Sequence, residues 1–238
     1  YLTANLSWHA DYVLVLDASA TRGDLSGWVT LDNQSGTSFG AAELKLVAGN
    51  VQRVEPPPPP PAPAMDMVAQ SEAANGGFRQ EPLFEYHLYA LGRPADVLDK
   101  EQKQISLLEA HGITLHQKLR LSGSHEGHRT PWRQPPTKQK PSAFVVLDNS
   151  EASGLGMPLP AGTVRVYEAD SSGSQQFVGE DAIEHTPRDE KIEIRLGEAF
   201  DVVAERRQTS FRALGRCSSE SAWRIEIRNH KNEATAIE

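Results

Sequence analysis

The chain has 238 residues and a formal net charge of −8 at pH 7, and its length suffices for one large domain or two smaller ones. The acidic balance argues against a general nucleic-acid binder, which needs a basic surface, and no stretch reaches the roughly 20 apolar residues of a membrane span. A single cysteine, Cys217, excludes an intramolecular disulfide and a cysteine-based metal cluster, and its polar surroundings predict a partly exposed free thiol.

Short strands separated by turns open the chain. Residues 11–17 (DYVLVLD) form a nearly continuous apolar run, which is typical of a strand covered on both sides. Residues 25–33 (LSGWVTLDN) follow a turn and predict the returning strand. A further extended stretch covers residues 43–54.

A proline-rich segment interrupts this first region. Pro56–Pro61 is a run of six prolines, which favours a polyproline helix because proline cannot donate ladder hydrogen bonds. Residues 55–80 are therefore expected to form a linker or a long surface loop. A docking motif for a proline-binding domain is the alternative, but the flanking basic residue that such ligands often carry is missing.

The next strand is predicted over residues 83–91 (LFEYHLYAL). Its alternation places Phe84, Tyr86 and Leu88 on one face. Gly92 then ends the strand.

Two more strands and a basic insertion follow. Residues 102–109 have a composition compatible with a helix, but the surrounding pattern favours a strand. Residues 113–121 alternate clearly, which puts His116 on a solvent-facing side and His111 at the turn before it. Residues 122–140 are rich in Pro, Gly and basic side chains and predict a mobile loop.

The last part of the chain repeats the strand-and-turn pattern. Strands are expected at residues 143–147, 163–167, 176–178, 191–196 and 200–211. Trp223, Ile225 and Ile227 alternate with charged residues and are expected to face inward. A further strand begins at Thr235, so the natural protein is expected to continue beyond Glu238, and the missing initiator Met likewise suggests a fragment.

A weak repeat accompanies these strands. VTLDNQSG, VVLDNSEASG and IEIRNHKNE each place alternating apolar residues before an asparagine: Asn33, Asn149 and Asn229. Asparagine suits such a position because its side chain can close the following turn.

These elements predict an all-β protein made of antiparallel β-sandwich units of the immunoglobulin-like kind, two in number, with long irregular insertions. The first region is residues 1–121, interrupted by the proline-rich segment 55–80. The mobile basic loop 122–140 follows, and residues 141–238 form the second region, truncated at its C-terminus.

The histidines give no metal motif. His125, Glu126 and His128 resemble part of a zinc-protease helix, but that motif needs two residues between the glutamate and the second histidine. Neither a metal nor another cofactor is expected.

An acidic turn is the stronger candidate for a site. It collects five carboxylates and His185, a composition suited to general acid–base chemistry or to calcium, although no calcium-loop spacing is present. The carboxylates are Glu180, Asp181, Glu184, Asp189 and Glu190. A solvated acidic turn is the alternative. The candidate ligand-binding residues are Arg165, Glu180, Asp181 and His185.

Long segments of the chain resemble a bacterial domain of unknown function that occurs in mucoidy-inhibitor-like proteins. The resemblance is carried by residues 154–170, 179–211 and 84–89, by Lys103–Gln104, and by Tyr1, Leu2, Trp8 and Tyr12. It implies a predominantly β protein that is commonly exported, follows a separate N-terminal domain and coiled coil, and continues past Glu238. It implies no catalytic residues.

The expected function is therefore that of an exported bacterial module, periplasmic or on the cell surface, that binds or scaffolds a protein or glycan of the cell envelope. An enzyme is the less favoured reading. It would be a carbohydrate-active or metal-dependent hydrolase using the acidic turn Glu180–Glu190, and a purely structural module without any ligand is a third possibility.

Overall fold

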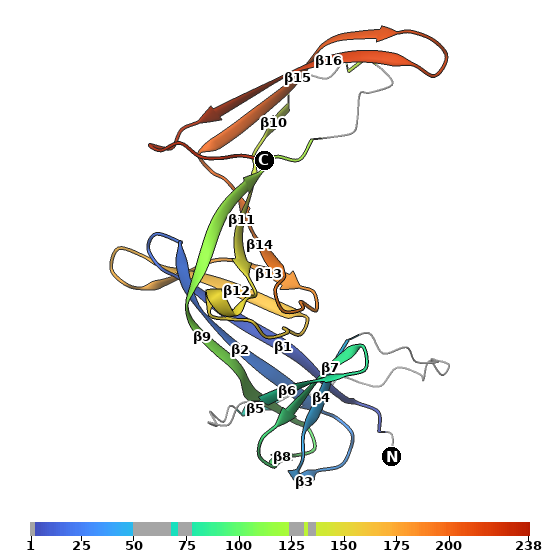
Figure 1. Ribbon diagram of the computed structural model, residues 1–238, viewed down its shortest axis with the longest axis vertical. Helices are drawn as coiled ribbons and strands as arrows, with labels where there is room; N and C mark the ends of the chain where they lie inside the picture. Colours follow the sequence, from blue (N-terminus) through green and yellow to red (C-terminus); the bar gives the residue numbers. More distant parts are fainter. Residues whose placement is uncertain (1–2, 50–67, 71–77, 124–130, 133–136) are drawn as a thin grey trace. The chain divides into compact units, whose positions relative to one another are not determined.

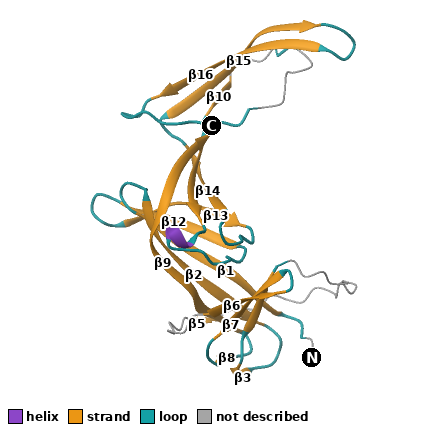
Figure 2. Ribbon diagram, viewed as in Figure 1, coloured by secondary structure: helices purple, strands orange, loops and turns teal. Residues whose placement is uncertain are grey.

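The computed structural model describes residues 3–49, 68–70, 78–123, 131–132 and 137–238, and it is built almost entirely of strands (Figures 1 and 2). This confirms the predicted all-β class. The elements are β1 (Leu6–Leu16), β2 (Arg22–Asn33), β3 (Phe39–Ala42), β4 (Lys45–Ala48), β5 (Val68–Gln70), β6 (Phe78–Leu83), β7 (Tyr86–Leu91), β8 (Ala95–Val97), β9 (Glu101–Arg120), β10 (Thr137–Gln139), β11 (Ser142–Asp148), the 3₁₀ turn η1 (Glu151–Ser153), β12 (Gly162–Ala169), β13 (Gln175–Ile183), β14 (Lys191–Glu198), β15 (Val202–Ala213) and β16 (Ser219–Asn229). The proline run Pro56–Pro61 and the histidines His125 and His128 lie outside the described residues.

The chain divides into two compact units, each made of two separate segments. The first unit is Tyr1–Leu115 with Leu147–Ile194, and the second is His116–Val146 with Arg195–Glu238. These units differ from the consecutive regions 1–121 and 141–238 expected from the sequence. The reason is long-range pairing, because β1 and β12 lie side by side in one sheet.

The main sheet has the strand order β13-β12-β1-β2-β9-β11-β14, with β5 added beside β9. It includes parallel pairing, since β1 pairs with β12 and β5 pairs with β9 in parallel. Gly162 permits the β1–β12 contact, because a Cβ at this position would overlap the carbonyl oxygen of Ala10. Two small antiparallel sheets, β4-β7-β6 and β3-β8, complete the first unit.

Strand β1 shows how this sheet divides into two faces. Tyr12, Leu14 and Leu16 are buried, whereas the alternate side chains Asp11, Val13 and Val15 are only half-buried. The strand predicted at 11–17 is therefore present, but it is fully covered on one face only. The other face remains accessible and carries the site described below.

The predicted strand 83–91 is in fact the second half of a hairpin. β6 and β7 pair with Leu83 opposite Tyr86, so that Phe84 and Glu85 form the connecting turn. Phe84 has a φ of 57° and is 91 % exposed. The expected face shared by Phe84, Tyr86 and Leu88 was thus wrong, because alternation in sequence does not reveal a tight turn that lacks glycine.

Strand β9 runs without a turn through the position where one was expected. His111 and Gly112 together oppose the single residue Asp24 of β2, and Gly112 has a φ of 65°. This is a β-bulge, which absorbs the extra residue while the pairing continues. His116 lies on the exposed side of β9, as predicted.

The second unit contains the sheet β10-β15-β16 and a small core. Leu119, Ala199 and Val202 form this core, with Ala143 and Ile237 packed against it. Ile237 also forms an isolated bridge to Leu119, whereas the strand predicted to begin at Thr235 is not formed over residues 235–238.

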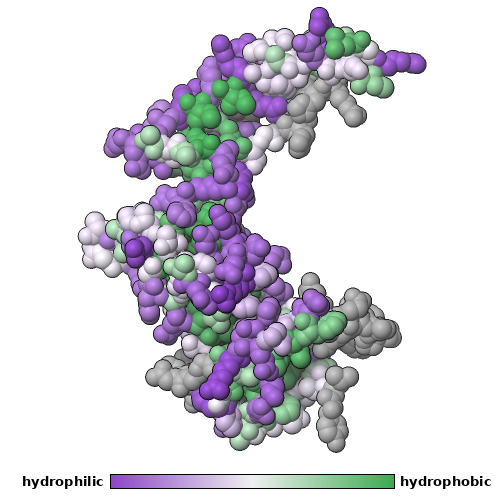
Figure 3. Space-filling model, viewed as in Figure 1, coloured by the Kyte–Doolittle hydropathy of each residue, from purple (hydrophilic) through white to green (hydrophobic). Residues whose placement is uncertain are grey.

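The outer part of this sheet is not packed inward as expected. Ile225 and Ile227 are 57 % and 47 % exposed, respectively, and apolar side chains reach the surface of the unit (Figure 3). The prediction that these residues face inward was therefore wrong, since alternation identifies a shared face but not what covers it.

Candidate functional site

A polar hollow lies on the accessible face of the main sheet. Strand register brings its residues together, since His9 lies opposite Thr30 and Asp11 opposite Trp28, while Val13 pairs with Arg165. The hollow has a volume of about 380 Å³, and its lining residues are His9, Asp11, Val13, Trp28, Thr30, Gln102, Gln104 and Arg165.

Asp11 is the centre of the polar contacts in this hollow. Its Oδ2 accepts a hydrogen bond from Thr30 Oγ1 at 3.2 Å and lies 3.2 Å from His9 Nε2. Its Oδ1 accepts from Arg165 Nη1 at 3.3 Å. The Asp11 side chain is only 19 % exposed, so the guanidinium of Arg165 compensates a carboxylate that is largely removed from water.

Arg165 also joins the hollow to the neighbouring edge strand. Its Nε lies 3.4 Å from Glu180 Oε2, and the two residues face each other across the β12–β13 pair. The structure thus brings together two of the four residues proposed from the sequence.

The other two proposed residues have different surroundings. Asp181 follows Glu180 along β13 and pairs with Val164, so its side chain points to the opposite face of the sheet. His185 lies beyond the end of β13, where its Nδ1 accepts a hydrogen bond from Ala161 N at 3.0 Å. Neither residue lines the hollow.

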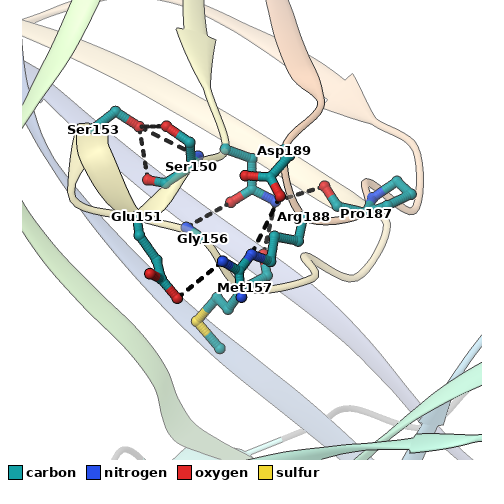
Figure 4. A network of polar contacts seen from close by, with 9 residues as sticks. Ser150, Glu151, Ser153, Gly156, Met157, Pro187, Arg188 and Asp189 are labelled. Carbon is teal, nitrogen blue, oxygen red and sulfur yellow. Dashed lines mark hydrogen bonds and ion pairs between the residues drawn. The ribbon is translucent and has the colours of Figure 1, made fainter.

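The remainder of the acidic turn has structural partners. Asn149 Nδ2 donates to Pro187 O at 2.8 Å, and Asp189 N donates to Asn149 O at 2.7 Å. Arg188 points toward Glu151, with Nη2 and Oε1 3.2 Å apart, and its Nε lies 3.3 Å from Asp189 Oδ2 (Figure 4). These contacts tie residues 187–190 to the loop after β11 through backbone groups and the Arg188 side chain, and Asp189 is the carboxylate of the turn that takes part in them.

The hollow presents charged, amide and aromatic groups together. Arg165 and His9 both contact Asp11, and the amides of Gln102 and Gln104 and the indole of Trp28 complete the lining. The Thr30 hydroxyl is buried and donates to Asp11, which leaves it poorly placed to attack a substrate.

Three further properties of the described residues bear on function. No group of three or more His, Cys, Asp or Glu in this part of the chain is arranged to hold a metal ion. None of the described segments is a helix with the length and apolar character required to cross a membrane. Cys217 is an exposed free thiol, as predicted.

Sequence reasoning missed most of the hollow. His9, Asp11, Thr30 and Gln104 come from three strands, and nothing in their spacing relates them. The sequence carried only a weak indication of this site, namely that Asp11 and Thr30 are polar residues beside strongly apolar strand segments.

Comparison with known proteins found no matching family model, no matching curated protein and no matching solved structure. The resemblance to the bacterial domain of unknown function stays a prediction.

Proposed function

We propose that the chain is a binding module whose ligand occupies the hollow around Asp11 and Arg165. The observation that carries this proposal is the combination of a charge-compensated carboxylate, two glutamines and Trp28 on one accessible sheet face. Ligand sites in proteins typically combine an apolar surface with a few convergent polar groups.

The ligand class that fits best is a glycan. Sugar hydroxyl groups both donate and accept hydrogen bonds, which matches the amide groups of Gln102 and Gln104 together with Asp11. The apolar face of a sugar ring can pack against the indole of Trp28, whose amphipathic ring suits a half-wet surface. The hollow is open and shallow, which favours an extended chain over a small, enclosed cofactor.

The setting proposed for this activity is the bacterial cell envelope. We take the module to be exported and to belong to the family that it resembles in residues 154–170 and 179–211. Its strands are proposed to form two immunoglobulin-like β-sandwich units, with the hollow on the outer face of one sheet. The all-β class and the two compact units are compatible with this arrangement.

Glycan-array screening followed by isothermal titration calorimetry tests the proposal. Asp11→Asn removes the charge that Arg165 compensates while keeping a similar shape, and Gln102→Ala removes an amide; each is expected to weaken binding about tenfold. Glu85→Ala, at the exposed tip of the β6–β7 hairpin, is the matched control and should bind like the wild type. Equal affinity of Asp11→Asn and wild type would contradict the assignment.

A hydrolase using the acidic turn is the second candidate, favoured by the contact between Glu180 and Arg165 at the rim of the hollow. It predicts turnover of the bound glycan that is lost in Glu180→Gln. Binding without product release in the wild type would leave the binding module as the function.

A further inference from the structure

Strand β16 ends its sheet with one side unpaired among the described residues. The order β10-β15-β16 places it at the edge, and its 11 residues (SESAWRIEIRN) make a long edge strand. Such edges expose backbone donors and acceptors that can pair with another strand, and proteins usually protect them. The side chains of β16 show which strand would fit.

The charges within the β15–β16 hairpin are arranged unfavourably. Arg224 of β16 lies directly opposite Arg207 of β15, and Glu226 lies directly opposite Glu205. Like charges directly across a ladder are destabilising. Arginines of β16 offset part of this repulsion. Arg228 lies 3.2 Å from Glu205 and 3.9 Å from Glu226, and Arg224 lies 4.0 Å from Glu226.

A second copy of β16 is complementary to these charges. Antiparallel pairing of two β16 strands about a twofold axis at Ile225 sets Arg224 of each copy opposite Glu226 of the other. A row of side chains then crosses the four strands of the dimer. It consists of Arg207 (β15) and Arg224 (β16) of one copy, followed by Glu226 (β16) and Glu205 (β15) of the other, so that two positive charges meet two negative ones. Every copy presents the same patch, as a twofold interface requires.

The opposite face of the strand is complementary in the same register. The two Ile225 side chains meet at the axis, and Trp223 of each copy lies opposite Ile227 of the other. Ile225 and Ile227, which are about half exposed, would thereby gain apolar neighbours. Arg206 already stacks on Trp223, with its guanidinium carbon 3.8 Å from the ring centre, which fixes the indole beside this edge.

We propose that the chain forms a twofold-symmetric homodimer in which the β16 strands pair antiparallel with Ile225 at the axis. The two three-stranded sheets then become one continuous sheet across the dimer. This inference is independent of the ligand proposed for the hollow.

Analytical ultracentrifugation of the full chain tests the dimer, with a mass twice that of the chain expected at micromolar concentration. Glu226→Arg sets an arginine against Arg224 at two symmetric places and is expected to raise the dimer Kd about tenfold or more. Within its own hairpin the new arginine faces Glu205, and this opposite-charge pair offsets the lost contacts of Glu226 with Arg224 and Arg228. The hairpin should therefore be retained, with an unchanged circular dichroism spectrum. The double variant Arg224→Glu/Glu226→Arg restores complementarity and should return the Kd to near the wild-type value.

Disulfide trapping tests the register in a Cys217→Ser background. Ile225→Cys places the two thiols at the axis, where directly opposed Cα atoms lie about 4.5–5.5 Å apart, within the range that a disulfide spans. Ser221→Cys lies on the same strand but would face Asn229 of the second copy, so it should not cross-link. A wild-type chain that stays monomeric, a Glu226→Arg variant with unchanged Kd, or equal cross-linking at both positions would overturn the proposal.

Discussion

Three asparagines show how single side chains organise the turns of this protein. Asn33, Asn149 and Asn229 each stand at, or directly after, the end of a strand, and each side chain bonds to backbone groups of the segment that follows. Asn33 Nδ2 donates to Thr37 O at 2.9 Å, and Asn229 Nδ2 donates to Glu233 O at 2.8 Å. The turn-closing role predicted from the repeat is confirmed at all three positions.

Asn149 is fully buried beside the acidic turn. We expect Asn149→Ala to lower the free energy of unfolding by about 2 kcal/mol. The substitution leaves the carbonyl oxygens of Met157 and Pro187 and the amide of Gly156 without this partner, while the site is buried. Urea unfolding measures the loss.

Asn229→Ala is the matched control, since Asn229 makes similar turn contacts at an exposed position where water can replace them. The free energy of unfolding of this variant should fall by less than about 1 kcal/mol. An equal decrease in the free energy of unfolding for both variants would show that burial does not determine how much these hydrogen bonds contribute to stability.

At the scale of elements, two tyrosines hold the irregular segment 154–160 that leads into β12. Tyr12 Oη donates to Pro160 O and Tyr89 Oη donates to Pro158 O, both at 2.8 Å. Burial raises the pKa of both hydroxyls above the ordinary tyrosine value; for Tyr12, Tyr89 and Asp11 add to the effect. Side chains of β1 and β7 thus hold the segment, together with the backbone bridge between Leu159 and Thr186.

These raised pKa values predict a loss of stability in alkali. The folded state keeps both hydroxyls protonated, whereas the unfolded chain ionises them near pH 10, so the contribution is complete below about pH 10 and declines as the pH rises further. The decline should reach at most about 1.4 kcal/mol per tyrosine for each pH unit. Urea unfolding at pH 9, 10 and 11 measures it, and Tyr12→Phe should flatten the slope.

Absorbance titration provides the check on the folded protein. Full ionisation of all five tyrosines near pH 10, with a native circular dichroism spectrum, would contradict the prediction.

At the scale of the whole molecule, the two units differ in how much apolar surface they bury. The first unit has a large core that includes Tyr12, Leu14, Val29, Val164 and Val166, all almost inaccessible to solvent. The core of the second unit centres on Leu119, Ala199 and Val202, and most of β16 is exposed. The second unit is therefore expected to open more readily.

Hydrogen exchange measured by mass spectrometry tests this difference at a concentration where the chain is monomeric. Amides of β16 (Ser219–Asn229) should exchange at least about 100-fold faster than those of β1 (Leu6–Leu16), because local opening exposes little apolar surface in the former. Equal protection would show that the two units unfold together.

The sequence by itself determined the class of the protein, most of its strands and the turns closed by asparagine. Lys191–Leu196 illustrates why: a period of two places Ile192 and Ile194 on the buried side of β14, and this depends only on local geometry. The hairpin turn at Phe84 escaped prediction because no glycine marks it. The bulge at Gly112 was predicted as a turn, because glycine occurs in both turns and β-bulges.

Only the tertiary structure decided which strands lie together. Alternation assigns each side chain to a face but says nothing of partner or register, which depend on contacts between distant residues. The parallel pairing of β1 with β12 therefore places Arg165 beside Asp11. The pairing of β12 with β13 brings Glu180 next to Arg165. Asp181 is one residue further along β13, so its side chain lies on the other face. The sequence groups Arg165, Glu180 and Asp181 as one candidate site. The strand register places Arg165 and Glu180 on one face of the sheet and Asp181 on the other.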